Sequence, residues 1–315
     1  MTKGRPPVTD DDLYRHTSQF RLWSFTKDQL RTRQQEVHDA AAKKIGNQLK
    51  EHGLGDDDEI RPLTLDEELK LIRFYASKVE DITKLFQMPS QVRATAVSYF
   101  RKFYLVYSVM DYHPKNILYT CVFLASKAEN HFISIEKFCG SLPRTETTQL
   151  LNLEFLILQS LSFTLAVLNG LRPLHGFFLD LQATNPDIDT STMGSIHDKA
   201  RRTIIQGFIS NAPFFYTPPQ IALGALYAVD PDLTEKYIRK KYEDLQDHVD
   251  HLLEIVKDCK KELLDISVPA SEDGKEIDRK LHSCLNPLKY IQKRKSSHTP
   301  DRSESPVPKK LKTQE

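Results

Sequence analysis

The chain has 315 residues, with 44 Lys and Arg against 43 Asp and Glu, and only 11 glycines. At roughly 100–200 residues per domain the length predicts about two domains, and the net charge of +1 argues against a globally basic nucleic-acid binder. The four cysteines contain no CxxC pair, which excludes a zinc ribbon or a thioredoxin-type motif, and we expect them to be buried reduced thiols: Cys121, Cys139, Cys259 and Cys284.

Residues 1–61 are predicted to form a polar N-terminal arm with one helix over Thr26–Gln48. Thr26 can cap this helix, and Gln29 stands three residues later, as in a capping box. The helix has a thin apolar face made of Leu30, Val37 and Ala41. Because the face is thin, we expect the helix to dock on a larger domain, with Trp23 and Phe25 as anchors just before it.

A helical domain is predicted over residues 62–168. Thr64 and Glu67 form a capping box, and apolar residues then recur at spacings of three and four as far as Phe86. A later helix opens at Pro114 and is apolar on almost every side, so it should be central and buried. The other predicted helices are Val92–Phe103, one opened by Ser134, and the nearly all-apolar Leu150–Leu158. No sustained strand pattern occurs, and the fold class is therefore all-α.

The start of the central helix recurs later in the chain. Tyr112-His-Pro114 with Ile117 matches Tyr216-Thr-Pro218 with Ile221 at a constant offset of 104 residues. This period is too long for a solenoid and favours a duplicated domain over 169–268, although chance similarity of two helix starts is an alternative. The helices predicted there are Leu174–Leu181, Met193–Ile209, Pro218–Val229, Leu233–Leu245 and Val249–Leu264.

A polar break at Ser267–Gly274 is expected to close the second domain. A final helix over Ile277–Ile291 is then predicted within the segment 269–295.

The familiar catalytic signatures are missing from the sequence. It has no Walker A loop, GxGxxG, HExxH, GxSxG or kinase motif set, so we expect no catalytic residue, metal or cofactor. His248 and His251 lie three residues apart on a predicted helix. A metal site there is one interpretation, but a solvated polar face is favoured because no other ligand converges on it.

Two charges interrupt the apolar helices of the first domain. Lys127 ends the central helix and Glu154 lies within the last one, and burying either charge alone would be costly. They can pair with each other, or they can rim an apolar surface and meet a partner's backbone groups. Alternatively, Lys127 caps the carbonyls of the last turn. The positions of the two charges on the predicted helices favour capping or internal pairing.

Three segments resemble the cyclin family: Phe123-Leu-Ala-Ser-Lys127-Ala-Glu129, Leu153–Phe163 and Tyr99–Tyr104. The resemblance implies two tandem five-helix cyclin boxes flanked by N- and C-terminal helices. It also implies that Lys127 and Glu154 face a cyclin-dependent kinase rather than only each other. The apolar part of that kinase-binding surface would be formed by Leu158, Phe163, Leu165 and Phe123.

Within the family, the stretches Ser18–Thr26, Met110–Pro114 and Gln292–Lys295 resemble the H-type cyclins. That resemblance implies a non-catalytic subunit of the CDK-activating kinase, in a trimer with the kinase and an assembly factor. Such a trimer phosphorylates other cyclin-dependent kinases and, within transcription factor IIH, the C-terminal repeats of RNA polymerase II. No direct contact with nucleic acid or membrane is implied.

The C-terminal residues, 296–315, are expected to be a disordered basic tail. Two basic clusters separated by a 13-residue spacer have the layout of a bipartite nuclear import signal: Lys293, Arg294, Lys295, Lys309, Lys310 and Lys312. A solvated basic tail is the alternative interpretation. Thr299 and Ser305 precede prolines and are candidate phosphorylation sites. The chain lacks an apolar signal peptide, and we expect a soluble nuclear protein.

Three other interpretations stay open. A DNA-binding factor with duplicated cyclin folds, like transcription factor IIB, would have a zinc ribbon and a basic core, and the sequence has neither. An enzyme on an all-α scaffold would need a convergent site. Another transcriptional cyclin, of the cyclin C type, is disfavoured by Trp23, by Tyr112-His-Pro114 and by the long tail.

Overall fold

The computed structural model describes residues 13–51, 61–243 and 246–285, and all regular structure in these ranges is helical. The helices are η2 (Tyr14–His16), α1 (Ser18–Trp23), α2 (Lys27–Glu51), α3 (Leu65–Leu85), α4 (Ser90–Phe103), α5 (Pro114–Ala128), α6 (Ile135–Gly140), α7 (Thr147–Ser160), α8 (Leu171–Thr184), α9 (Thr190–Gly207), α10 (Ala212–Phe215), α11 (Pro218–Val229), α12 (Pro231–Lys241), α13 (Gln246–Leu264) and α14 (Ser271–Leu285).

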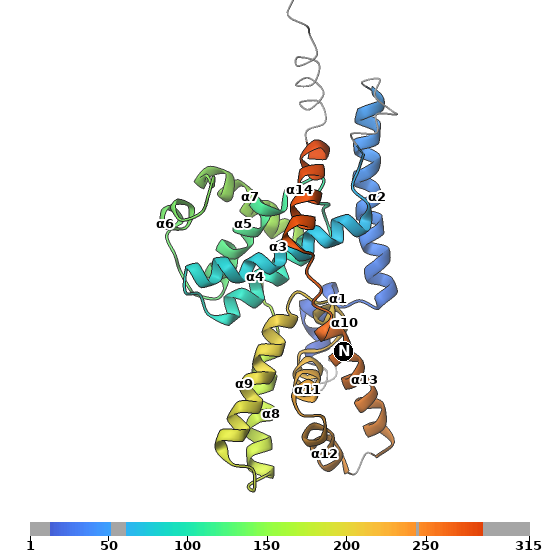
Figure 1. Ribbon diagram of the computed structural model, residues 1–315, viewed down its shortest axis with the longest axis vertical. Coiled ribbons are helices and arrows are strands. Elements are labelled where there is room, and N and C mark those ends of the chain that lie inside the picture. The colour runs from blue at the N-terminus through green and yellow to red at the C-terminus, as the bar shows by residue number, and fades with distance from the viewer. Residues whose placement is uncertain (1–12, 52–60, 244–245, 286–315) are drawn as a thin grey trace, which may run out of the picture.

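Figure 1 shows these helices as two units stacked along the long axis of the molecule, with α2 and α14 beside the upper unit. The first unit contains α3–α7 and the second contains α8–α13. The all-α prediction is confirmed. No helix in the described ranges is long and apolar enough to cross a membrane.

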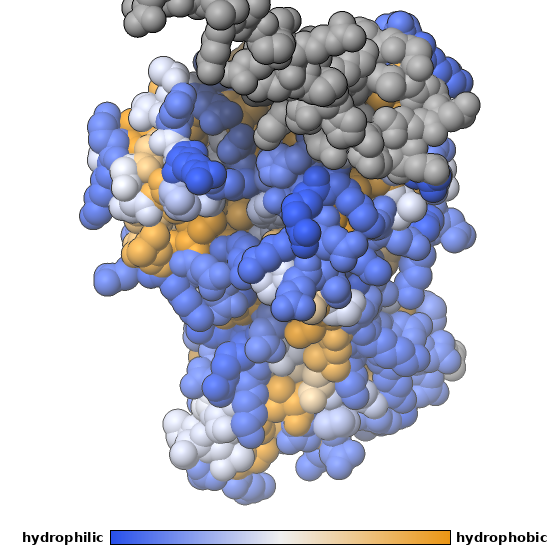
Figure 2. Space-filling model, turned by 45° about the horizontal axis from the view of Figure 1, so that its top comes forward, coloured by the Kyte–Doolittle hydropathy of each residue, from blue (hydrophilic) through white to orange (hydrophobic). Residues whose placement is uncertain are grey.

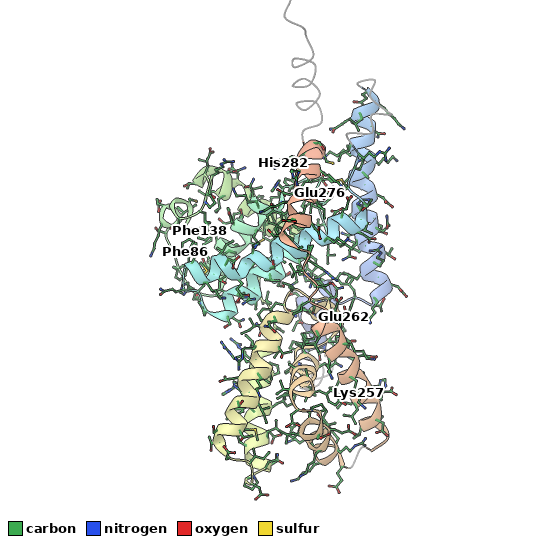
Figure 3. All side chains as sticks on the ribbon, in the orientation of Figure 1. Phe86, Phe138, Lys257, Glu262, Glu276 and His282 are labelled. Atoms are coloured by element: carbon green, nitrogen blue, oxygen red, sulfur yellow. The ribbon has the colours of Figure 1, made fainter. Side chains whose placement is uncertain are left out.

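The first unit is organised around α5. Pro114 occupies its first turn, and every residue from Leu118 to Ser126 except Tyr119 is buried, with α3, α4 and α7 packed around the helix. The predicted capping box of α3 is present, because the Thr64 hydroxyl accepts from the Glu67 amide and the Glu67 carboxylate accepts from the Thr64 amide. At the far end Phe86 stacks on Phe138 of α6 (Figure 3).

The second unit repeats this plan around α11. Thr217 and Gln220 form its capping box, Pro218 lies in its first turn, and α8, α9, α12 and α13 surround it. Since α5 and α11 hold the same central position in their units, the duplication predicted from the offset of 104 residues is confirmed.

Helix α2 docks on the first unit, as predicted from its thin apolar face. Thr26 and Gln29 exchange the expected pair of capping hydrogen bonds. The sequence did not indicate the buried polar contact beneath the helix. His38 Nδ1 lies 2.9 Å from Glu68 Oε2 of α3, and the other oxygen of Glu68 accepts from the Val109 amide at 3.0 Å. This contact joins three segments of the chain in one buried network.

The predicted break at Ser267–Gly274 is wrong at its C-terminal side. Ser271 begins α14, with Glu272 and Asp273 in the first turn, where negative side chains interact favourably with the helix dipole. Gly274 is needed for packing, since a Cβ there would lie 2.7 Å from Cδ2 of Phe74 on α3. The polar composition therefore marks a helix start. The predicted continuation of this helix to Ile291 lies outside the described residues beyond Leu285.

Two glycines of α9 give a matched test of this packing. A Cβ at Gly207 would lie 2.2 Å from Cδ1 of the buried Leu263 on α13, whereas a Cβ at Gly194 would meet nothing within 4 Å. We expect Gly207→Ala to destabilise the fold by about 1–3 kcal/mol through overpacking. Gly194→Ala should stabilise it by about 0.5–1 kcal/mol. Urea unfolding of the two variants measures both effects, and equal effects would contradict the close approach of α9 and α13.

Arg101 of α4 is buried where the two units meet. Its guanidinium donates to the Ser210 carbonyl and, at 2.5 Å, to Asn211 Oδ1, and it stacks 4.7 Å from the ring centroid of Phe214. All three of these partners belong to the second unit. Arg101 therefore ties the two units together by charge-assisted hydrogen bonds.

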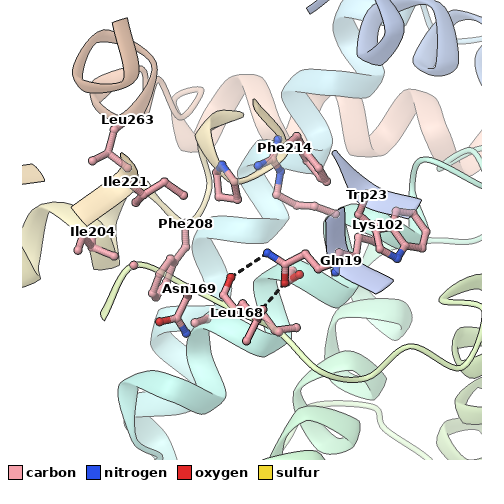
Figure 4. Close-up of a pocket in the computed structure, with 17 residues that line it drawn as sticks. Gln19, Trp23, Lys102, Leu168, Asn169, Ile204, Phe208, Phe214, Ile221 and Leu263 are labelled. Carbon is pink, nitrogen blue, oxygen red and sulfur yellow. Dashed lines mark hydrogen bonds between the residues drawn. The ribbon is translucent and has the colours of Figure 1, made fainter. Parts of the chain in front are cut away.

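The neighbouring Lys102 is buried without such partners. It lines a cavity of about 40 Å³ between the units, with Trp23 beside it (Figure 4). Its ammonium lies 5.3 Å from the Trp23 ring centroid, and no hydrogen-bond acceptor among the described residues reaches it. Burial lowers the pKa of Lys102 from 10.5 to about 8.

Candidate functional site

The first unit leaves large apolar side chains exposed on α7 and on the turn that follows it. Leu151 is 47% exposed, Phe155 58% and Phe163 61%, and the Phe155 and Phe163 rings meet edge to face at 6.3 Å. Figure 2 shows apolar surface on this unit, at the left of the view. A cluster of exposed aromatic rings is typical of a protein-binding surface.

Lys127 and Glu154 form an ion pair beside this apolar surface. The Lys127 side chain is 36% exposed, and its ammonium also lies 4.8 Å from the ring centroid of Phe123. Of the sequence alternatives, internal pairing is thus observed, at the rim of an exposed apolar surface. Capping by Lys127 is not, because no hydrogen bond joins its ammonium to a described carbonyl.

The remaining apolar residues proposed for this surface differ in exposure. Phe163 is exposed, whereas Leu158 and Leu165 are partly buried against the core. Phe123 is buried beneath Lys127 and packs on Phe138 at 5.4 Å. Phe123 therefore supports the ammonium from below, while Phe155 and Leu151, which the sequence analysis did not single out, supply accessible area.

Phe163 is held outward by an unusual turn. Ser162 and Phe163 both adopt left-handed backbone conformations, with φ of 51° and 54°. The Phe163 amide donates to the Leu158 carbonyl at 2.9 Å, which closes the end of α7. A bulky residue with positive φ is strained, and such strain concentrates at functional sites. The turn contains no glycine, so the sequence carried no signal for it.

The N-terminal arm fixes the linker between the two units. Gln19 donates to the Leu168 carbonyl at 2.8 Å and accepts from the Leu168 amide at 2.7 Å (Figure 4). Trp23 is buried, and its indole N–H donates to the Thr164 hydroxyl at 3.2 Å. The predicted anchors thus lie against this linker and the junction of the units, where Phe25 packs edge to face on Phe214.

A second hydrogen bond fixes the linker from inside the first unit. The hydroxyl of Tyr99 donates to the Leu165 carbonyl at 2.6 Å. Burial and the nearby Glu129 carboxylate raise the pKa of Tyr99, so this donor keeps its proton. The exposed turn is therefore attached to rigid helices on both sides.

Among the residues that the structure describes, no set of metal ligands comes together at His248 and His251, where both side chains are exposed on α13. In the described ranges, a group of His and Asp ligand atoms within 4.8 Å of one another occurs at His113, Asp278 and His282. The basic clusters, Thr299 and Ser305 lie outside the described residues. All four cysteines are buried free thiols, as predicted.

This geometry is suited to binding a protein. The apolar surface supplies area that a partner can cover, and the ion pair at its rim can exchange internal bonds for bonds to a partner's backbone. Charged groups of this kind fix the register of an interface more than they add affinity.

Comparison with known proteins agrees with the two-unit architecture. The model of the cyclin N-terminal domain matches residues 72–166, and that of the cyclin C-terminal domain matches residues 169–264. The cyclin CCL1 of Saccharomyces cerevisiae is 36% identical over 98% of this chain and 91% of its own length.

Two solved complexes contain chains of the same shape. One is the CAK complex of Chaetomium thermophilum bound to ATP-gamma-S, in which the matching chain has a TM-score of 0.80 and 28% identity, over 96% of this chain and all of that one. The other is the yeast TFIIK complex of Kin28, Ccl1 and Tfb3, with a TM-score of 0.67 and 36% identity over 79% of this chain and all of that one.

Proposed function

This chain belongs to the cyclin family, and on that premise we propose that it is an H-type cyclin, the regulatory subunit that binds and activates a kinase of the CDK-activating type. The observation that carries the proposal is the Lys127–Glu154 pair beside the exposed Phe155 and Phe163 rings. The similar chain in the yeast TFIIK complex is named with a kinase and a third protein, Kin28 and Tfb3, which supports an equivalent trimer here.

The activation step follows from differential binding. A regulatory subunit stabilises one conformation of its kinase only by binding that conformation more tightly than the other. In protein kinases, an internal Lys–Glu ion pair must be assembled for phosphoryl transfer, and the position of helix αC controls it. A rigid apolar surface with a charged rim holds that helix in place, and the cyclin itself contributes no catalytic group.

The substrates and the compartment follow from the same proposal. The trimer phosphorylates other cyclin-dependent kinases and, within transcription factor IIH, the C-terminal repeats of RNA polymerase II. This work takes place in the nucleus, and the two basic clusters of the C-terminal segment serve as the import signal. Phosphorylation at Thr299 or Ser305 adds negative charge between those clusters and weakens import.

Reconstitution from purified components tests the proposal. The full chain is mixed with a CDK-activating kinase catalytic subunit, with and without its assembly factor, and phosphate transfer to a polymerase repeat peptide is measured. We expect a stable complex and at least a tenfold increase in rate over the kinase alone. A chain that neither co-elutes with the kinase nor raises its activity would overturn the proposal, and duplex-DNA binding would then be measured.

A further inference from the structure

The C-terminal helix brings two ligand-type side chains to the start of the central helix of the first unit. Asp278 and His282 are four residues apart on α14, so they share one face of the helix. Opposite them is His113, the N-cap residue of α5. Figure 3 labels His282 on α14, beside the upper unit. Ligand atoms of the three side chains all lie within 4.8 Å of one another.

The distances approach those of a tetrahedral metal site. With metal–ligand bonds of about 2.0–2.2 Å, neighbouring ligand atoms of such a site are about 3.3–3.6 Å apart. His113 Nε2 lies 3.2 Å from Asp278 Oδ1, and His282 Nε2 lies 3.9 Å from Asp278 Oδ2. The second distance closes by a small rotation of His282, whose side chain is 66% exposed.

The hydrogen bonds around these ligand atoms leave a nitrogen of His113 available for an ion. His113 Nε2 is one of two buried side-chain polar atoms in the described ranges that make no hydrogen bond, although the Asp278 carboxylate is close to it. The hydroxyl of Tyr75 donates to Asp278 Oδ1 at 2.9 Å and orients the carboxylate, as outer hydrogen bonds do at metal sites.

Metal binding has one local cost. His113 Nδ1 accepts the Lys115 amide at 3.2 Å, which caps α5. Coordination through Nε2 places the ring proton on Nδ1, so this bond is lost. It is a single long hydrogen bond, whereas the ion gains three protein ligands.

We propose that His113, Asp278 and His282 bind a divalent ion of the zinc class, which fastens α14 to the first unit. Two imidazoles and one carboxylate suit zinc, whereas magnesium and calcium prefer oxygen ligands throughout. The open face at His282 leaves the fourth position to water. The proposal does not depend on kinase binding, since none of the three residues belongs to the Lys127–Glu154 surface. The sequence alone did not indicate the site because His113 is far from Asp278 and His282 along the chain.

Calorimetric titration of the full chain with zinc chloride, after chelator treatment, tests the site. We expect one zinc ion per chain with a dissociation constant of about 10 μM or tighter, and a higher unfolding temperature with zinc. Magnesium and calcium at the same concentrations should give no binding. His282→Ala and Asp278→Asn should weaken zinc binding at least tenfold. His113→Asn should do the same while keeping helix α5 capped, because asparagine is a good N-cap residue.

His251→Ala is the matched control, since His251 is an exposed histidine on α13 outside the cluster, and it should bind zinc like the unchanged chain. No saturable binding up to 100 μM zinc would overturn the proposal, with 100 μM being about ten times the expected constant. Binding that persists unchanged in all three cluster variants would overturn it as well.

Discussion

Reversing either charge of the Lys127–Glu154 pair is expected to weaken kinase binding by about 30-fold or more, which corresponds to the loss of one desolvated charge contact at an interface. Lys127→Glu and Glu154→Lys each place two like charges side by side at the rim of the apolar surface. The effect on the free energy of unfolding should stay within about 1 kcal/mol, because partly exposed ion pairs contribute little to stability.

The double reversal separates the two roles of the pair. It restores an attractive ion pair within the chain, so its stability should return to that of the unchanged protein. Kinase affinity should not return, because the partner's backbone groups would meet the opposite charges. Affinity is measured by surface plasmon resonance, and activation by phosphate transfer to a repeat peptide.

Glu136 and Lys137 on α6 provide the control. They are adjacent exposed charges of the same helical unit that belong neither to α5 nor to α7, and reversing both should leave kinase affinity unchanged. If the double reversal at Lys127 and Glu154 recovered full affinity, their role would be internal pairing alone, and the proposed contact with the kinase would fail.

Replacing Arg101 and Lys102 by methionine is expected to change stability in opposite directions, although the two residues are adjacent, buried and equally charged. Arg101→Met removes donors from the Ser210 carbonyl and the Asn211 amide oxygen, and should destabilise the fold by about 2–4 kcal/mol. Lys102→Met removes a charge that burial of the side chain disfavours and whose described contact is with the Trp23 ring. The substitution also loses the contact with the Trp23 ring. With that loss included, Lys102→Met should stabilise the fold by about 1–3 kcal/mol at pH 7.

The pH dependence of Lys102 has a definite sign. Its pKa is lowered to about 8 in the folded chain and is 10.5 in the unfolded one. Between these values the unfolded chain holds a proton that the folded chain has released, so stability contributed by this group rises with pH. The advantage of Lys102→Met over the unchanged protein should therefore shrink from pH 7.5 to pH 9.5.

Urea unfolding of both proteins at the two pH values measures this difference, and other titrating groups cancel because both proteins share them. A constant advantage across that range would show that Lys102 does not titrate there. Equal signs for the Arg101 and Lys102 variants at pH 7 would contradict the assigned hydrogen bonds at the junction of the two units.

The sequence predicted the helices well where the signal was local. The capping boxes at Thr26 and Thr64 and the proline starts of α5 and α11 depend on a few neighbouring residues, and all occur as expected. The polar start of α14 was misread as a break, since its stability depends on Gly274 meeting Phe74, a contact between distant parts of the chain.

The candidate site was predicted in part for the same reason. Lys127 and Glu154 are charged residues within otherwise apolar helices, and this pattern is visible in the sequence. The exposed position of Phe155 and the left-handed turn at Phe163 are not, because each depends on how α7 ends and packs. The buried pair of His38 and Glu68 likewise requires the docking of α2 on α3, which no local pattern specifies.

The attachment of the linker by Gln19, Trp23 and Tyr99 has a consequence for how fast a partner can bind. Residues 161–168 lose their conformational freedom when the chain folds, before any partner arrives. The surface is therefore already ordered when a partner arrives, and little ordering entropy opposes the complex. Association should proceed in a single kinetic phase at a rate limited by orientation and diffusion, with no slow rearrangement of this turn after first contact.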